Sequence, residues 1–492
     1  MAVDESTLPE EPYPSAGHHR HQRRRHRRRQ PAAWSADQLL DPLVLVATAP
    51  MAFFPERFPR EAYVIAVALL VVPYVVRKSN TGYFTVLTPM LWPLLFIAVV
   101  VLPISAWVTP SFWAVSWPEF VRFVWGMAVL LGVANWCAAG GSHVHSDGLQ
   151  RSVKAHMTAA TAAYFALGVA FSSVGMLALR STSKMPLLGD LANLIPEATW
   201  LPESIAQGFN ANRVAGVAVL FLPLALGIAL GPLTTRRSSQ TGILVKIAAV
   251  GLVFFFGAVL LLTQSRTALL ASVVAVILVS VLAGRRGLIP LVVIAIFVVA
   301  ALDVFGPSGL VRTFSVGAGS ATTAEGQPSL WGRVMEDRNV AGRLVIWQRA
   351  LHGIADQPLT GMGLAGFEVR SQEPYPAMPD WHPDPDVVHA HNLFLQTGLD
   401  MGLPGLLAVV AVVAVAVWEV VAIYMGTRAT SPARFWDIGL AGALCAFVVY
   451  NMLDAVTVGA RPAVAYWYLL GLIAGGGAAL RAAQSAHYPA YE

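Results

Sequence analysis

The sequence predicts an all-α polytopic membrane protein of about 12 transmembrane helices, with a large extracytoplasmic loop that contains short helices between spans nine and ten. Of its 492 residues, 56% are apolar and only 12% are charged, and the mean hydropathy is +0.60. Soluble globular domains do not have this composition. Apolar segments long enough to cross a bilayer also recur along the whole chain.

The first 36 residues predict a disordered basic cytoplasmic tail. Seven arginines lie between Arg20 and Arg29. Such a cluster is able to bind nucleic acid or anionic lipid head groups, but it is also typical of the cytoplasmic side of membrane proteins, and we expect no nucleic-acid partner. The basic region is too long for a cleaved signal peptide and follows an acidic, proline-containing stretch. The first apolar segment should therefore remain in the protein.

Apolar segments divide the rest of the chain into two membrane regions. The first, residues 37–305, holds nine predicted spans, near 37–54, 62–76, 84–108, 119–139, 158–179, 214–231, 243–262, 267–283 and 288–305. The second, residues 392–481, holds three, near 393–425 (with a break near Gly402 and Pro404), 435–458 and 463–480. Residues 306–391 are the predicted extracytoplasmic loop domain, and 482–492 a second cytoplasmic tail.

Charge fixes the predicted orientation. An even number of spans puts both termini on one side, and the loops expected there are basic, with Asp147 as their only acid. Their cationic residues are Arg77, Lys78, Arg151, Lys154, Arg236, Arg237, Arg285, Arg286, Arg428 and Arg434. The loops on the other side mix both signs, as the Lys/Arg bias of inner loops predicts. We therefore expect a multi-pass protein of the cytoplasmic (inner) membrane with both termini cytoplasmic. Its outer face would carry residues 180–213, the turn TQSRTA and the long loop.

Two patterns suggest cofactors, and we reject both. Cys137 and Cys445 lie in apolar segments, which predicts neither a disulfide nor a thiolate metal site. Several histidines and aspartates gather before span ten, but they are scattered through a proline-rich loop without metal-ligand spacing, so we expect no metal. These residues are His382, His389, His391, Asp380, Asp384 and Asp386.

The segment PLTGMGLAGF matches a dinucleotide-binding GxGxxG pattern by letter, through Gly361, Gly363 and Gly366. It follows a predicted helix instead of a strand and lies outside the membrane, so a dinucleotide site is rejected. The glycines instead predict a tight turn that brings backbone amides close to another group, with an anion as one candidate.

Arg266 lies in LLLTQSRTALLAS, with apolar sequence on both sides. A single arginine at the membrane edge is commonly a snorkelling anchor. Here the turn is very short, and Gln264, Ser265 and Thr267 add polar groups around the same point, which favours a ligand-binding role.

Arg343 opens GRLVIWQRALHGIADQPL, where Leu344, Trp347, Leu351 and Ile354 recur at helical spacing and predict the buried face of a docked helix in the loop. Arg343 borders this face, so it either points into the protein or remains a surface charge. Arg349 is expected to face solvent.

His391 is the candidate catalytic residue. Histidine titrates near neutral pH, and His391 stands where a helix enters the bilayer, so the helix dipole favours a neutral imidazole able to accept a proton. A purely structural histidine is the alternative reading, and His389 is an alternative base. Arg213 is a secondary candidate because the neighbouring Asn210 and Asn212 already explain its motif as a helix cap.

Three motifs taken in order resemble the O-antigen ligase and O-antigen polymerase family of bacterial membrane glycosyltransferases. They are SRTALL, GRLVIWQRAL followed by PLTGMGLAGF, and HAHNLFLQTGLDMGLPG, and the resemblance covers about residues 200–460. It implies transfer of a glycan from a polyprenyl-diphosphate donor to an acceptor hydroxyl outside the inner membrane, without a nucleotide sugar, metal or other cofactor. The acceptor would be a glycan, a lipid or a protein in contact with the bilayer.

The resemblance also implies roles for particular residues. Arg266 and Arg343 fall where the family places diphosphate-binding arginines, and His391, before Asn392, falls at its essential histidine. Arginine forks match phosphate oxygens, and a histidine base would give an inverting, single-displacement transfer. The secondary candidates are Arg213, His389, Asn392, Gln264 and Ser265.

Two other functions stay open at this stage. A polysaccharide polymerase would use the same donor chemistry, with another lipid-linked glycan as acceptor. A 12-span transporter or flippase is less compatible, because the few charges inside apolar segments lie near span ends and no paired broken helices occur in two matching halves. Those charged residues are Arg122, Lys246, Asp303, Glu419 and Asp454.

Overall fold

A computed structural model gives the arrangement of the chain. It describes residues 36–109, 112–138, 146–177, 179, 209–232, 239–296, 299, 303, 338–370, 389–429, 431–454, 456 and 458–485. Within these ranges the only regular secondary structure is helical, which agrees with the predicted all-α membrane class. The predicted basic tail and much of the predicted extracytoplasmic loop, including His382, Asp380, Asp384 and Asp386, lie outside the described residues.

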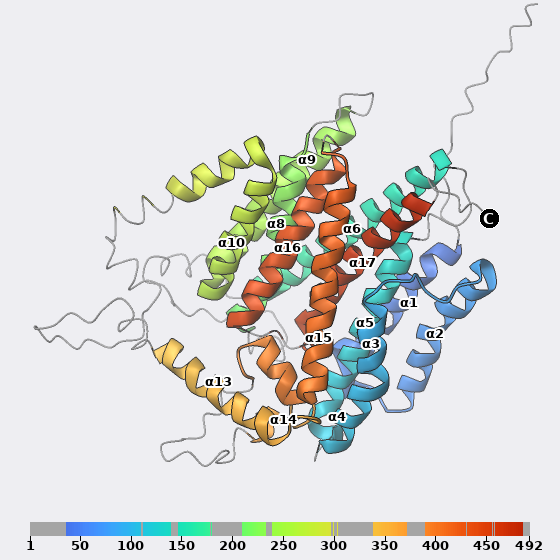
Figure 1. Ribbon diagram of the computed structural model, residues 1–492, viewed down its shortest axis with the longest axis vertical. Helices are drawn as coiled ribbons and strands as arrows, with labels where there is room; N and C mark the ends of the chain where they lie inside the picture. The colour runs from blue at the N-terminus through green and yellow to red at the C-terminus, as the bar shows by residue number, and fades with distance from the viewer. Residues whose placement is uncertain are drawn as a thin grey trace, which may run out of the picture.

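Long helices form the body of the protein (Figure 1). They are α1 (Ala36–Phe53), α2 (Ala62–Thr81), α5 (Trp117–Ala138), α6 (Ser146–Leu177), α8 (Ala211–Leu230), α9 (Ser239–Thr263), α10 (Arg266–Leu282), α15 (Leu393–Gly426), α16 (Ala433–Leu453) and α17 (Val464–Ser485). A further apolar stretch combines α3 (Leu91–Phe96), a π-helical turn (Ile97–Val101) and α4 (Leu102–Val108). Two helices lie outside the membrane segments, α13 (Arg338–Asp356) and α14 (Gly366–Arg370).

The described helices match most of the predicted spans. Nine are long and apolar enough to cross a membrane, and two shorter apolar helices, Leu39–Phe53 and Arg266–Leu282, coincide with the first and eighth predicted spans. Residues 288–296, in the ninth predicted span, are also helical. A polytopic membrane protein is therefore confirmed, while the total of twelve spans stays a prediction.

The helix α16 packs on α8, α10 and α15 and runs antiparallel to all three, while α17 packs on α5 and α15. The contact between α8 and α16 is very close, since a Cβ added to Gly227 would lie 2.6 Å from Cα of Gly439. The starts of α8, α10 and α15 therefore lie at the same end of the bundle as the end of α16 (Figure 1).

The predicted break in α15 is confirmed. Gly402 has φ 65° and ψ −174°, a combination open essentially to glycine alone. The segment after α13 fills this break: Leu403 N–H donates to Pro358 O at 2.7 Å, and Met362 N–H donates to Leu399 O at 2.6 Å. The glycine-rich turn thus brings its backbone up to α15, and a Cβ on Gly361 would lie 2.6 Å from the amide nitrogen of Gly402.

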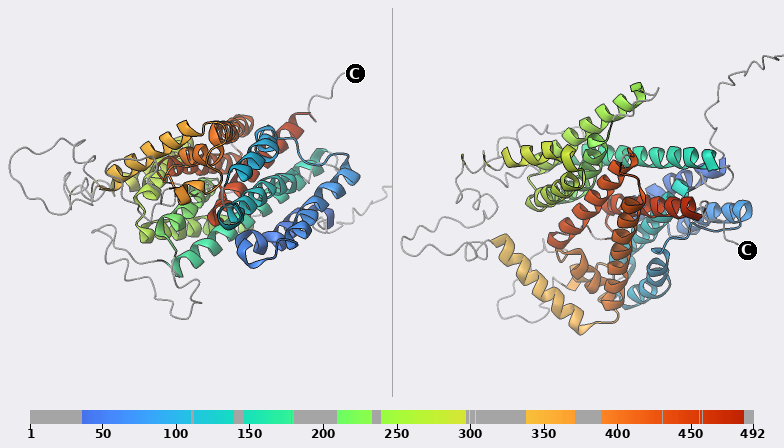
Figure 2. Two further views of the ribbon diagram at one scale, coloured as in Figure 1. Left: turned by 90° about the horizontal axis from the view of Figure 1, so that it is seen from below. Right: turned by 45° about the horizontal axis from the view of Figure 1, so that its top comes forward.

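The helix predicted between spans nine and ten exists as α13, but its predicted buried face is wrong in part, because only Ile354 of the expected positions is buried. Figure 1 and the right-hand view of Figure 2 place α13 obliquely across the end of the bundle at which α15 begins. It docks through Ile346, Ala350 and Ile354, in one apolar cluster with Met362, Phe367 and Leu399. Leu344 and Leu351, expected inside, are 43% and 57% exposed.

Arg349 corrects a second expectation for α13. Its side chain is 1% exposed, although it was expected to face solvent. The stripe that docks is spaced i, i+4 and i+8 from Ile346, and Arg349 lies beside it one position before Ala350. Because α13 turns this stripe to the protein, Arg349 turns inward with it.

Candidate functional site

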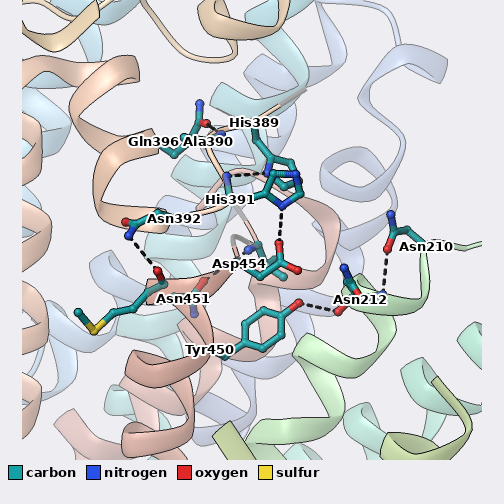
Figure 3. Close-up of polar contacts among 12 residues, drawn as sticks. Asn210, Asn212, His389, Ala390, His391, Asn392, Gln396, Tyr450, Asn451 and Asp454 are labelled. Atoms are coloured by element: carbon teal, nitrogen blue, oxygen red, sulfur yellow. Dashed lines mark hydrogen bonds and ion pairs between the residues drawn. The ribbon is translucent and has the colours of Figure 1, made fainter. Parts of the chain in front are cut away.

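An imidazole and a carboxylate meet at the end of the bundle where α15 starts (Figure 3). His391 lies in the short segment before α15, and Asp454 directly follows α16. The distance between His391 Nδ1 and Asp454 Oδ1 is 3.0 Å. The His391 side chain is 28% exposed and that of Asp454 is 3% exposed, so the carboxylate is covered while the imidazole is accessible.

This hydrogen bond sets the tautomer of His391. An ionised carboxylate only accepts, so the proton between the two groups belongs to Nδ1 of the imidazole. Nε2 of a neutral His391 then keeps its lone pair. An oriented imidazole with a free Nε2 is the arrangement in which histidine takes a proton from a hydroxyl.

His389 supports the neighbouring backbone. The N–H of His391 donates to Nδ1 of His389 at 3.2 Å, and the two rings meet edge to face with centroids 4.3 Å apart. His391 itself has φ 48°, a left-handed backbone conformation that is uncommon for residues other than glycine. Since Nδ1 of His389 already accepts a hydrogen bond, His389 acts here as a support for the strained residue.

Charge around the pair favours a neutral His389 and an ionised Asp454. Burial, His391 and the positive charges of Arg213 and Arg343 lower the pKa of His389 to about 3, against an opposing effect of Asp454. Burial alone would raise the pKa of Asp454, but the hydrogen bond from His391 and the nearby positive charges outweigh it, and the net shift is downward. Two arginines from separate helices therefore act on one site.

Arg213 owes its place to the start of α8. The Asn210 side chain accepts the N–H of Asn212 at 2.9 Å, which confirms the expected helix cap. Tyr450 Oη on α16 donates to Asn212 O at 2.6 Å (Figure 3). These bonds tie the first turn of α8 to the end of α16, so Arg213, expected only as a secondary candidate, lies in the field of the histidines.

The Asn392 side chain caps the start of α15 and also forms a hydrogen bond with α16. Its side-chain oxygen accepts the N–H groups of Phe394 at 2.9 Å and Leu395 at 3.1 Å. Its Nδ2 donates to Met452 O at 3.0 Å on α16. Adjacent residues, His391 and Asn392, are therefore both bonded to the end of α16.

Arg266 is the first residue of α10, and the tight turn before it is observed between α9 and α10. Gln264 and Ser265 are buried, and Gln264 has φ 50°. The Ser265 Oγ atom has no hydrogen-bond partner among the described residues. Because α10 packs on α8 and α16, Arg266 is brought to the same end of the bundle as Asp454.

The pair and its neighbour could also be considered as metal ligands. One ligand atom each from His389, His391 and Asp454 lie within 4.8 Å of one another. A cation bound there would have to displace the proton that joins His391 to Asp454, and it would face the positive charges of Arg213 and Arg343. The charges of this site thus suit an anionic ligand better than a metal ion.

Asp454 is the residue that sequence reasoning missed. It was noted only as a charge near the end of an apolar segment, as part of the argument on transport. The signal was present, because an acid in NMLDAV closes a predicted span on the same outer face as His391. An ionisable residue at that depth is itself a marker of function.

The fold and this site together define a polytopic membrane protein with a histidine–aspartate pair, set among arginines, at one end of its helical bundle. Residues 251–410 match the family model described as O-antigen ligase. This match confirms the resemblance over a segment that contains Arg266, Arg343 and His391 and supports a membrane glycan-transfer function. A comparison with curated proteins finds no match for the chain.

Proposed function

We propose that the protein is a membrane glycosyltransferase that moves a glycan from a polyprenyl-diphosphate donor to an acceptor hydroxyl. The observation that carries this proposal is the hydrogen bond between His391 and Asp454, at 3.0 Å, in the field of Arg213 and Arg343. It supplies an oriented base beside fixed positive charge, which is what glycosyl transfer from a diphosphate requires.

In this mechanism, His391 Nε2 accepts the proton of the acceptor hydroxyl while the oxygen attacks the anomeric carbon. A new C–O bond forms on one face of the sugar as the bond to the diphosphate breaks on the other, so the configuration is inverted. The diphosphate leaves with the bonding electrons. Asp454 stabilises the imidazolium that results, as a buried carboxylate does for a catalytic histidine.

Arginines hold the leaving group. We assign Arg266 and Arg343 to the diphosphate, because guanidinium forks bind phosphate oxygens in pairs and remain charged at any working pH. Arg213 contributes to the same field from the start of α8. Fixed cations matter most here as negative charge develops on the bridging oxygen in the transition state.

The basic loops support the expected orientation. Lys78 lies in the last turn of α2, and Arg285 and Arg428 follow the ends of α10 and α15, all at the opposite end of the bundle from His391. Under the positive-inside rule that end is cytoplasmic, and the site then lies on the outer face of the cytoplasmic membrane with both termini inside. The donor would reach it from the outer leaflet.

Purified protein tests the proposal directly. A polyprenyl-diphosphate glycan and candidate acceptors are incubated with the protein and a chelator, and the release of lipid diphosphate is measured. We expect release that depends on the acceptor and persists with the chelator. His391→Ala should lower turnover by roughly 100- to 10,000-fold. The matched control is His352→Ala, which removes an exposed histidine of α13.

Three results would redirect the proposal. Normal release by His391→Ala would refute the assignment of the base. Products that lengthen without any second acceptor would identify a polymerase that uses the lipid-linked glycan as both donor and acceptor. Counterflow of a labelled solute in proteoliposomes that does not change in His391→Ala would favour a transporter.

A further inference from the structure

Asp400 is a buried carboxylate that the proposed mechanism does not use. It lies in α15 two residues before the break at Gly402, and it is 2% exposed. A carboxylate held so far from water is costly unless its oxygens accept several hydrogen bonds. The hydrogen-bond partners of Asp400 therefore indicate its role.

One side of Asp400 leads to the histidine segment. Gln396 Nε2 donates to Asp400 Oδ1 at 2.9 Å, and Gln396 Oε1 accepts the N–H of Ala390 at 2.7 Å. Ala390 is the residue between His389 and His391. This short chain of bonds thus ends on the backbone that carries the base.

The other side of Asp400 leads to the turn behind α13. The backbone N–H of Ala365 donates to the Asp400 carboxylate, and Ala365 has φ 56°. Ser105 Oγ donates to Asp400 O and accepts the N–H of Leu364, both at 3.0 Å. The same group thus bonds to the segment that follows α13, the helix of Arg343.

We infer that Asp400 is a positioning residue: through Gln396 it fixes the His391 segment in its strained conformation and joins that segment to the turn behind α13. The inference rests on the proposed function. A left-handed backbone conformation is kept only where surrounding bonds hold it. Ala365 and His391 both have positive φ. The hydrogen bonds described above hold the amide of Ala365 itself and the amide of Ala390, which precedes His391.

The direction of the bonds explains why position 400 carries a carboxylate. Ala390 N–H and Ala365 N–H enter the chain from its two ends, and both donate. Between them, the Gln396 side chain accepts from Ala390 N–H through its oxygen and donates to position 400 through its nitrogen. The side chain at position 400 must therefore accept from both Gln396 and Ala365. Both side-chain oxygens of an aspartate can accept a hydrogen bond, whereas the nitrogen of a side-chain amide at position 400 only donates and would face one of these two donors.

This reasoning gives a test in which a double change restores what a single change removes. Asp400→Asn alone places an NH2 group against a donor, and Gln396→Glu alone places two carboxylates together. In the double variant Gln396→Glu/Asp400→Asn, the carboxylate accepts from Ala390 and from the new amide, whose oxygen accepts from Ala365. The whole chain of bonds is satisfied again with the same atoms in reversed order.

We expect Asp400→Asn to lower kcat on the order of 100-fold, as a displacement of about 1 Å of a reacting group does, with little change in the KM for the donor. The double variant should recover most of this loss. The matched control is Thr397→Val, since Thr397 is equally buried on the same turn and its hydroxyl bonds only to Leu393 O within α15.

Hydrogen exchange, followed by mass spectrometry, gives a readout that is independent of turnover. The peptide containing Ala390 and His391 should exchange faster in Asp400→Asn, return to the wild-type rate in the double variant, and remain unchanged in Thr397→Val. The midpoint of thermal unfolding in detergent is measured alongside. A merely structural role would lower the unfolding midpoint and the turnover together and would raise exchange throughout α15.

Three outcomes overturn the inference: unchanged kcat in Asp400→Asn, a folded double variant that fails to recover turnover, or exchange that rises throughout α15. They are separable from failure of the proposed function. If wild-type protein transfers no glycan, the exchange measurements still test the positioning. If His391→Ala is inactive while Asp400→Asn is normal, the positioning alone fails.

Discussion

Nδ1 of His391 donates a hydrogen bond to Asp454 at 3.0 Å, although 63 positions separate the two residues in the sequence. The bond joins the start of one membrane helix to the end of another. It leaves Nε2 of His391 as the acceptor, which is why we assign proton transfer to that atom.

Replacement of the carboxylate is the first prediction. In Asp454→Asn, the amide can donate to Nδ1, which moves the imidazole proton to Nε2 and removes the acceptor. We expect kcat to fall by roughly 100- to 10,000-fold, comparable with the loss of a general base. The measurement is release of lipid diphosphate at saturating donor. Asp356→Asn, an exposed acid at the end of α13, is the control, and an Asp454→Asn rate within twofold of wild type would rule out the assignment.

The second prediction concerns the arginines. Arg343→Lys keeps the charge but loses the planar fork, so we expect a higher KM for the donor and a lower kcat, with a combined loss of roughly 10-fold or more; Arg266→Lys should behave similarly. Steady-state kinetics with varied donor concentration provide the measurement. Arg285→Lys alters an exposed arginine at the opposite end of the bundle and should match wild type. Equal donor kinetics in all three variants would contradict the diphosphate assignment.

The third prediction is a pH effect on stability. The folded pKa of His389 is about 3, below its ordinary 6.5, so between these values the unfolded chain holds a proton that the folded chain lacks. Stability must therefore rise with pH across this window and fall on acidification. In His389→Asn, whose side-chain oxygen can still accept the His391 N–H, the midpoint of thermal unfolding should fall less between pH 6.5 and pH 4. A wild-type midpoint that is independent of pH in this window would count against a neutral, buried His389.

The fourth prediction concerns the break in α15. Gly402→Ala puts a side chain at φ 65°, and its Cβ would lie 2.7 Å from the carbonyl carbon of Leu359. We expect a loss of stability of about 1 to 3 kcal/mol from the backbone conformation alone. Thermal unfolding in detergent gives the comparison. Gly251→Ala in α9 is the control, because its Cβ would meet nothing within 4 Å and alanine favours a helix. Equal midpoints for both variants would show that the break tolerates a side chain.

Local sequence properties were sufficient for much of this fold. Hydropathy located the membrane helices because each span must satisfy its own backbone hydrogen bonds and face lipid. The glycine and proline near position 402 predicted the break in α15 for an equally local reason. Asn210 likewise predicted the cap of α8 from the residues beside it.

The predictions that were wrong or incomplete concern side chains whose positions depend on contacts between distant segments. Ile354 was predicted correctly, but the spacing of α13 allows more than one apolar stripe through it. Only the surface offered by Met362 and Leu399 selects Ile346 over Leu344 and Leu351. Arg349 was misjudged for the same reason. The pairing of Asp454 with His391 also needs the packing of α15 on α16, and no periodicity in either segment contains that information.

The two adjacent bonds from His391 and Asn392 to the end of α16 couple the geometry of the base to the relative tilt of two spans. Membrane helices change tilt when the hydrocarbon thickness of the bilayer departs from their own apolar length. A lipid environment that tilts α16 relative to α15 would pull the carboxylate from the imidazole. Under the proposed mechanism, the acyl-chain length of the surrounding phospholipids would therefore change the rate of glycan transfer.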